Sequence, residues 1–351
     1  MTADALPPWL DGPLAQALRA TRGHALLLHG PQGVGQFELA MAVASAWLCE
    51  AEEGARPSGR ACGRCTACHL LAARTHPDLL VLIPEALQDR LGWNAADDAD
   101  DAEGGKGKAK SSKEIKVEAV RTAVAFAQQT ASRGGTKVVV VHPADRMNAT
   151  SANALLKTLE EPPGRARFVL TSSAPQRLLP TVRSRCQARR VALPDAHVAA
   201  GWLAAQQIEQ PAVLLAAAGG APLDVIDRLA LGVDAACWQR LPREVLAGQS
   251  ATLAAWPLPL AIEALQKLCH DAMALAVGAA PRYFPVAAMP TGAELSRLTD
   301  CARDLRAEAR RAEHPWNATL AVESLVQTVR YAMQSPATGR VARDPLATLG
   351  R

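Results

Sequence analysis

Short apolar runs and apolar positions at helical spacing alternate along the first half of the chain. Residues 24–30 (HALLLHG) form an apolar run that is too short for a helix and ends in glycine, as is typical of a buried strand. From Phe37 to Cys49, apolar side chains recur at the three- and four-residue spacing of one helix face. A glycine-rich stretch separates the two, so the pattern predicts a strand, a tight turn and a helix.

The same alternation continues as far as residue 172 and indicates an α/β domain. Strands and helices that follow one another at this length favour a parallel sheet with helices on both faces. Pro162 and Pro163 end the last predicted helix, because proline cannot continue one. Further strands are predicted at Leu79–Ile83, Val138–Val141 and Arg167–Ser172, and further helices at Ile115–Ser132 and Ser151–Glu161.

Strand signals fade after about Arg190, and helical spacing dominates from there to Met333. The stretch GGAP at 219–222 separates a small helical section from a larger helical bundle. Residues 95–113 carry a block of acidic residues and then a block of lysines, which predicts a solvated loop. The predicted domains are 1–188 (α/β), 189–236 (small, helical) and 237–335 (all-α), followed by a flexible tail at 336–351.

Composition narrows the class of protein only modestly. The 351 residues are 49% hydrophobic but only 4% aromatic, so the core is expected to consist mainly of Ala, Leu and Val. A net charge of +4 permits a nucleic-acid partner without requiring one. The first residues lack the basic and apolar regions of a signal peptide, and no uncharged apolar run reaches the ~18 residues of a membrane span. We therefore expect a cytoplasmic protein.

Half of the eight cysteines fall within twenty residues in the pattern C-x12-C-x2-C-x2-C. Four thiolates suit tetrahedral Zn²⁺, and because every position is cysteine, no site is reserved for water or substrate. The pattern predicts a structural zinc module, with four unrelated thiols as the alternative. The predicted ligands are Cys49, Cys62, Cys65 and Cys68; the scattered Cys186, Cys237, Cys269 and Cys301 are expected to be packed or surface thiols.

The turn after the first strand has the glycine spacing of a phosphate-binding loop, G-x-x-x-x-G-K-[ST]. Gly30, Gly33 and Gly35 fit that spacing, but Gln36 stands in place of the lysine and Phe37 in place of the Ser or Thr that holds magnesium. Backbone N–H groups of Gly33 and Gly35 could still cradle a phosphate. We expect ATP to be unbound or only weakly bound at this degenerate loop.

The order of the motifs resembles bacterial clamp-loader subunits of the AAA+ class, strongly over residues 9–190 and more weakly beyond. This resemblance implies an AAA+ P-loop domain with a zinc module at 49–68, a helical lid and a C-terminal collar, with 95–113 as an insertion. The collar likeness rests on HPWNATLAVESLV at His314–Val326. The matching motifs are the loop, the cysteine module, HPD (His76–Asp78), NALLKTLEEPP (Asn153–Pro163), LTSS and LLPTVRSRC (Leu178–Cys186).

The family includes ATP-hydrolysing motor subunits and a non-hydrolysing partner, and the departures from the motif favour the latter. Where the motors carry Asp-Glu after the third strand, this chain has His142 and Pro143, and Asp145 is poorly placed to substitute. Leu223 stands where the lid of the motors carries a sensing arginine. With Gln36 and Phe37, these losses imply that the chain does not hydrolyse ATP by itself.

The resemblance also gives Arg185, in the SRC triplet, the role of an arginine finger that reaches ATP on the adjacent subunit. The alternative is an ordinary surface arginine. The implied partners are clamp-loader ATPase subunits, a clamp-opening subunit, the sliding clamp and primed DNA, within a DNA-directed DNA polymerase holoenzyme. An ATP-hydrolysing motor subunit and a zinc-dependent DNA-binding protein are the alternative functions. Arg183, Arg189 and Arg190 lie nearby and could instead contact DNA phosphates.

Overall fold

The structure, a computed structural model, divides into two compact units, Met1–Trp202 and Leu203–Arg351. Most of the charged segment 95–113, part of the motif at 314–326 and the tail 336–351 lie outside the described residues. The three-domain division expected from the sequence stays a prediction. The structure describes residues 6–20, 23–93, 111–133, 135–312 and 317–334.

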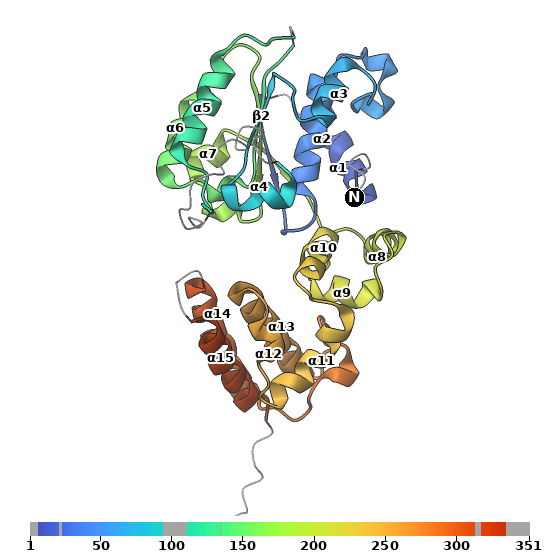
Figure 1. Cartoon of the computed structure of the whole chain (residues 1–351), viewed down its shortest axis with the longest axis vertical. Coiled ribbons are helices and arrows are strands. Elements are labelled where there is room, and N and C mark those ends of the chain that lie inside the picture. Colours follow the sequence, from blue (N-terminus) through green and yellow to red (C-terminus); the bar gives the residue numbers. More distant parts are fainter. Residues whose placement is uncertain (1–5, 21–22, 94–110, 134, 313–316, 335–351) are drawn as a thin grey trace, which may run out of the picture. The chain divides into compact units, whose positions relative to one another are not determined.

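The first unit is built on a five-stranded sheet in the order β2-β3-β4-β1-β5, with every neighbouring pair parallel (Figure 1). This confirms the predicted parallel sheet with flanking helices. The strands are β1 (Ala25–His29), β2 (Leu79–Leu82), β3 (Val138–Val141), β4 (Arg167–Ser172) and β5 (Gln187–Arg190).

Helices cover both faces of this sheet. In Figure 1, α5, α6 and α7 lie on one face, and α1, α2 and α3 on the other. Short 3-10 turns connect several elements, among them η1 (Pro8–Leu10) before α1. The helices are α1 (Asp11–Ala20), α2 (Gln36–Leu48), α3 (Thr66–Ala72), α4 (Glu85–Leu91), α5 (Val117–Gln128), α6 (Ala149–Glu160), α7 (Pro180–Ser184) and α8 (Ala196–Ala205).

The central strands are apolar throughout because both of their faces are covered. All four residues of β3 are fully buried, which accounts for an unbroken run of valines where a half-exposed strand would alternate. Leu27, Val139 and Phe168 share one core cluster with Leu155 and Leu159 of α6. Burial of this cluster therefore fixes α6, and the chain that follows it, against the sheet.

Strand β5 was not predicted from the sequence. Its residues, Gln-Ala-Arg-Arg, lack any apolar alternation, and they form a strand only because they pair with β1, with His29 opposite Arg190. The strand lies at the edge of the sheet. Charged side chains are common on edge strands, where they discourage pairing with other chains.

The second unit is all helical in the part of the chain that the structure describes. Its core includes Trp238, whose ring stacks on Phe284 with centroids 4.6 Å apart. The buried carboxylate of Asp271 accepts the N–H groups of Tyr283 and Phe284 at 2.7 and 2.8 Å and holds that loop in place. The helices are α9 (Pro211–Ala217), α10 (Pro222–Ala230), α11 (Ala235–Leu246), α12 (Ala251–Ala254), α13 (Leu258–Ala276), α14 (Leu295–Arg311) and α15 (Ala318–Met333).

Among the described residues, none of the helices has both the length and the apolar character that crossing a bilayer would require.

A buried ion pair joins the HPD motif to the start of β3. The side chains of Asp78 and Lys137 are 1% and 4% exposed, and Lys137 Nζ lies 3.1 Å from Asp78 Oδ1. Burial would raise the pKa of the Asp78 carboxyl. Hydrogen bonds from the N–H groups of Ser132 and Arg133, with the charge of Lys137, outweigh burial and leave that pKa below its ordinary value.

Replacing Asp78 with Asn should lower the free energy of unfolding by about 3 kcal/mol, because it leaves the Lys137 ammonium buried without a counter-charge. Because the pKa of Asp78 is lower in the folded chain than in the unfolded chain, its ionised carboxylate stabilises the fold above pH ~4. This stabilisation is lost as the pH falls through the pKa of the folded state. Denaturant unfolding at several pH values should therefore show the difference between wild type and Asp78→Asn shrinking below pH ~4. The exposed control Asp89→Asn should change stability by less than ~0.5 kcal/mol.

Candidate functional site

The glycines of the phosphate-type loop are required by close packing around the β1–α2 turn. A Cβ on Gly30 would lie 2.1 Å from the carbonyl oxygen of Val191, just after β5. A Cβ on Gly35 would lie 2.7 Å from the side chain of Leu10, and Gly35 has a φ of +100°, in the left-handed region. The fold therefore needs these glycines whether or not a phosphate binds.

Gln36, at the position of the lysine, turns its side chain back into the loop. It is 6% exposed, and its Nε2 donates hydrogen bonds of 2.7 Å to the carbonyl oxygens of both Gly30 and Pro31. A lysine at this position would extend a charged ammonium towards the phosphates. The Gln36 amide is neutral, and both of its donor hydrogens are used to brace the loop.

Phe37 and His142 occupy the two positions where a magnesium-binding hydroxyl and an acidic residue would be expected, and their rings contact each other. Their ring centroids are 4.8 Å apart, and the Trp93 ring lies edge-on to Phe37 at 6.1 Å. The His142 Nδ1 is 2.7 Å from the Thr171 hydroxyl. Burial lowers the pKa of His142 to about 4, so the ring is neutral at pH 7. This aromatic contact offers no anionic oxygen to a divalent cation.

Asp145 is committed to a local hydrogen-bond network. Its Oδ1 accepts the Ser172 hydroxyl at 2.6 Å and the N–H of Ser173 at 3.1 Å, both at the end of β4. The carboxylate thus connects the 3-10 turn after β3 to β4. Leu223, the other position singled out by the resemblance, lies in α10.

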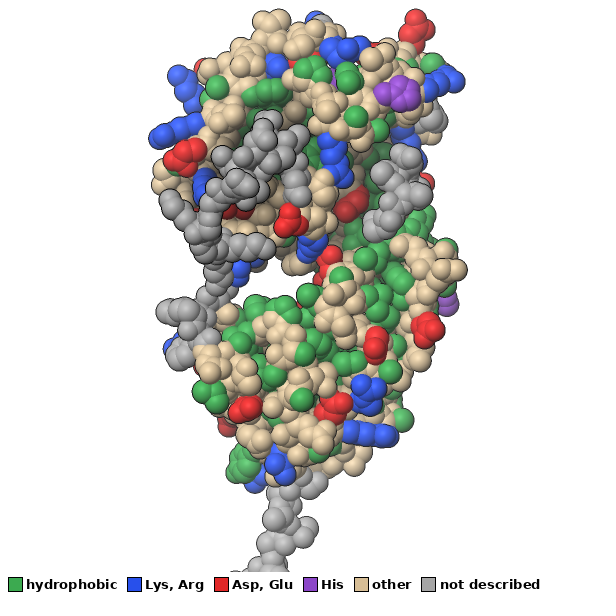
Figure 2. All heavy atoms as spheres, in the orientation of Figure 1, with side chains coloured by type: hydrophobic (Ala, Val, Ile, Leu, Met, Phe, Trp, Pro, Cys, Tyr) green, Lys and Arg blue, Asp and Glu red, His purple; other side chains and the backbone are tan. Residues whose placement is uncertain are grey.

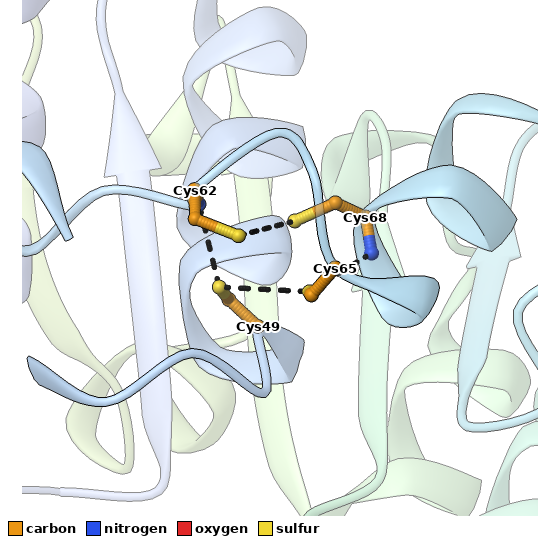
Figure 3. A group of neighbouring side chains, drawn as sticks. All are labelled: Cys49, Cys62, Cys65 and Cys68. Carbon is orange, nitrogen blue, oxygen red and sulfur yellow. Dashed lines mark hydrogen bonds between the residues drawn. The ribbon is translucent and has the colours of Figure 1, made fainter. Parts of the chain in front are cut away.

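The four clustered cysteines converge from three separate segments (Figure 3). Cys49 follows α2, Cys62 and Cys65 lie in the connection to α3, and Cys68 lies within α3. Their sulfur atoms lie within 4.8 Å of one another, with Cys49–Cys65 and Cys62–Cys68 separations of 3.9 Å. A tetrahedron with metal–sulfur bonds of ~2.3 Å has edges of about 3.8 Å. The cluster is close enough to bind a metal ion.

Backbone amides favour the thiolate form at part of this cluster. The N–H of Cys62 points at the Cys49 sulfur at 3.3 Å, and that of Cys68 at the Cys65 sulfur at 3.5 Å. Hydrogen bonds from the N–H groups of Arg64 and Cys65 lower the pKa of Cys62 to about 6, whereas burial raises that of Cys68 to about 12. Such donors orient thiolate ligands around a metal.

Three polar contacts attach the cysteine module to the sheet domain. Arg56 donates to the carbonyl oxygens of Ala46 and Cys49 and so caps the end of α2. Glu50 accepts both the N–H of Ala67 and the guanidinium of Arg133. The third contact is a salt bridge of 2.8 Å between Arg60 and Asp11 of α1. Because the module is held at several points, its geometry is tied to that of the sheet domain.

Arg185 lies at the surface, at the end of α7 and just before β5. Its side chain is 31% exposed and forms an ion pair with Glu160, the last residue of α6. A second guanidinium nitrogen donates to the carbonyl oxygen of Thr181 at 2.9 Å. The guanidinium is thus present on the surface but occupied by partners within the chain.

Sequence reasoning did not identify Glu160 as the partner of Arg185 or Arg56 as the cap of the module. A signal for Glu160 was present, because a carboxylate in the last turn of a helix opposes the helix dipole and is stabilised by a cation beside it. The other arginines near Arg185 differ in setting. Arg183 lies in α7, whereas Arg189 and Arg190 belong to β5.

The loop, the cysteine cluster and Arg185 all lie within residues 14–194, which match the family described as "DNA polymerase III, delta subunit". The chain belongs to this family. The membership expected from the order of the motifs is thereby confirmed. The matched residues begin within α1, include all five strands of the sheet and end just before α8.

Curated relatives of this chain include two proteins named DNA polymerase III subunit delta'. The one from Pseudomonas aeruginosa is 42% identical over 222 residues, and the one from Escherichia coli is 36% identical over 214 residues. The alignments cover 62% and 60% of this chain. The chain spans 59% and 56%, respectively, of the lengths of these relatives.

Two more distant similarities carry less weight. A DNA polymerase III subunit tau from Salmonella typhimurium is 30% identical over 163 residues, which cover 46% of this chain and 21% of that protein. Among solved structures, a DNA polymerase III gamma subunit-related protein from Thermotoga maritima has a TM-score of 0.48 and 17% identity, covering 92% of this chain and 99% of that one. A structural similarity at this level is no basis for inferring function.

Proposed function

We propose that this chain is a non-hydrolysing subunit of the DNA polymerase III clamp loader. In this role it supplies Arg185 as an arginine finger to ATP bound by a neighbouring ATPase subunit. It assembles with ATPase subunits and a clamp-opening subunit, and through the complex it helps to place the sliding clamp on primed DNA. The membership of its sheet domain in the DNA polymerase III delta family supports this function.

The main support for the non-hydrolysing role is that the Gln36 side chain binds the loop's own backbone. Both hydrogen bonds of its amide go to carbonyl oxygens of the loop itself, so the side chain at the lysine position offers no cation to a phosphate. Phe37 and His142 then fill the position of the magnesium ligands with rings. Loss of charge stabilisation and of metal ligands at one site removes what phosphoryl transfer requires. The same features disfavour the alternative of an ATP-hydrolysing motor subunit.

The cysteine cluster is proposed to hold one structural Zn²⁺. Four sulfurs with near-tetrahedral spacing complete the coordination of zinc and leave no open position for chemistry. A DNA-reading role for this module is less well supported. Figure 2 shows the Lys and Arg side chains of the drawn face interspersed with other types, and no continuous basic patch forms among the described residues there.

Metal analysis of the purified chain should give about one zinc per molecule. The double variant Cys62→Ser/Cys65→Ser should lose the metal and unfold at lower denaturant concentration, because metal binding contributes to folding free energy. The control Cys186→Ser, which changes a thiol of the sheet domain outside the cluster, should keep its zinc. The assignment would be refuted if the purified wild-type chain contained no zinc and adding zinc did not change its stability.

The isolated chain should show no ATP turnover above background, because its own site lacks the cation and the magnesium ligands. A phosphate-release assay with excess Mg²⁺ and ATP measures this. An active ATPase subunit assayed in parallel provides the control, and turnover by the isolated chain at a comparable rate would contradict the proposal.

Replacing Arg185 with Ala should lower the clamp- and DNA-stimulated ATPase rate of the assembled complex by the share of turnover that comes from the site this chain completes, since a finger in trans contributes about 10³–10⁵ to the rate at its own site in related enzymes. Fold and zinc content should not change. Arg121→Ala, which removes an exposed arginine of α5, is the control. An assembled complex that runs equally fast with Arg185→Ala would rule out the finger.

A further inference from the structure

The contact between Arg185 and Glu160 joins two residues that are 25 positions apart in the sequence. Glu160 ends α6, and Arg185 follows α7, which packs against α6. Guanidinium Nη2 contacts Glu160 Oε1, while Nη1 donates to the carbonyl oxygen of Thr181. The resting position of the guanidinium is therefore defined by the chain itself.

This resting position leaves the guanidinium incompletely satisfied. The Nε of Arg185 is buried and has no hydrogen-bond partner. Arginine binds an oxyanion best when two parallel N–H groups are used, and here Glu160 receives only Nη2. A phosphate that accepted N–H groups from both Nη1 and Nη2 would bind the guanidinium in the bidentate manner that Glu160 does not use.

The position of Glu160 also argues that the pair has a purpose beyond stabilising α6. A carboxylate in the last turn of a helix opposes the helix dipole, so the helix by itself gains nothing from an acid there. What Glu160 provides is a local counter-charge for Arg185. Glu161, the next residue, has no such ion pair in the described structure, although it is also exposed.

We propose that Glu160 is a restraining residue for the arginine finger: it holds Arg185 against the chain until ATP on a neighbouring subunit competes for the guanidinium. This inference rests on the proposed finger. Exposed ion pairs shift an equilibrium by only about two- to fivefold, and the side chains here are 31% and 46% exposed. The restraint is weak enough for a nucleotide phosphate to displace it, and it raises the ATP concentration needed to engage the finger by the same factor.

The restraint is tested first on the isolated full-length chain, where no neighbour is needed. Phenylglyoxal, which reacts with accessible guanidinium groups, should modify Arg185 about two- to fivefold faster in Glu160→Gln than in wild type, as measured by peptide mass spectrometry. The matched control Glu161→Gln should react at the wild-type rate. Equal rates in Glu160→Gln and Glu161→Gln would overturn the inference.

The assembled complex gives the second test. Glu160→Gln should lower the ATP concentration for half-maximal ATPase activity by about two- to fivefold without lowering the maximal rate, and Glu161→Gln should not. The double variant Glu160→Gln/Arg185→Ala should behave like Arg185→Ala alone, because a restraint has no effect without the finger. A lowered maximal rate in Glu160→Gln, or an effect that persists in the double variant, would overturn the inference.

The two proposals fail in different ways. If Arg185→Ala slows the complex but Glu160→Gln behaves like Glu161→Gln, the finger stands and the restraint is refuted. If Arg185→Ala leaves the complex unchanged, the finger itself is refuted, and the restraint on it falls as well. In that case faster modification of Arg185 by phenylglyoxal would report an ordinary surface ion pair.

Discussion

Close packing of backbone around the turn between β1 and α2 is the constraint on which the rest of the sheet domain depends. The carbonyl oxygen of Val191 comes so close to Gly30 that no side chain fits there. That contact brings the segment after β5 against the loop, and β5 carries the chain directly from Arg185. The glycines of this loop are thus required by close packing, so the loop keeps its geometry even where Gln36 and Phe37 replace the residues that would bind phosphate and magnesium.

Because backbone packing fixes the β1–α2 turn, the side chains around the turn can make internal structural contacts. Gln36 braces the loop carbonyls, and Phe37 packs against the neutral ring of His142. Asp145 binds the end of β4. Each is an internal contact of modest strength, and together they connect the loop, the end of β3 and the end of β4.

The two remaining candidate site features lie at the surface of this same sheet domain. The cysteine module is joined to α1, α2 and the segment before β3 by polar contacts, so a metal ion bound there would stabilise the sheet domain as well as its own loop. Arg185 sits between α7 and β5 with Glu160 beside it. A rigid frame of this kind suits a subunit whose proposed contribution is to present one cation to a neighbour.

The sequence alone was sufficient for features that depend on local pattern. The apolar runs predicted β1 to β4, because strands buried on both faces must be apolar, and the cysteine spacing predicted a cluster that the fold brings together. The missing lysine at Gln36, the missing hydroxyl at Phe37 and the missing acidic residue at His142 were equally visible in the sequence. Only the tertiary structure decided where the polar residues Gln187–Arg190 would go, since their strand exists through pairing with β1. It also decided the partner of Arg185, because an ion pair between residues 25 positions apart depends on how α6 and α7 pack, which no local pattern specifies.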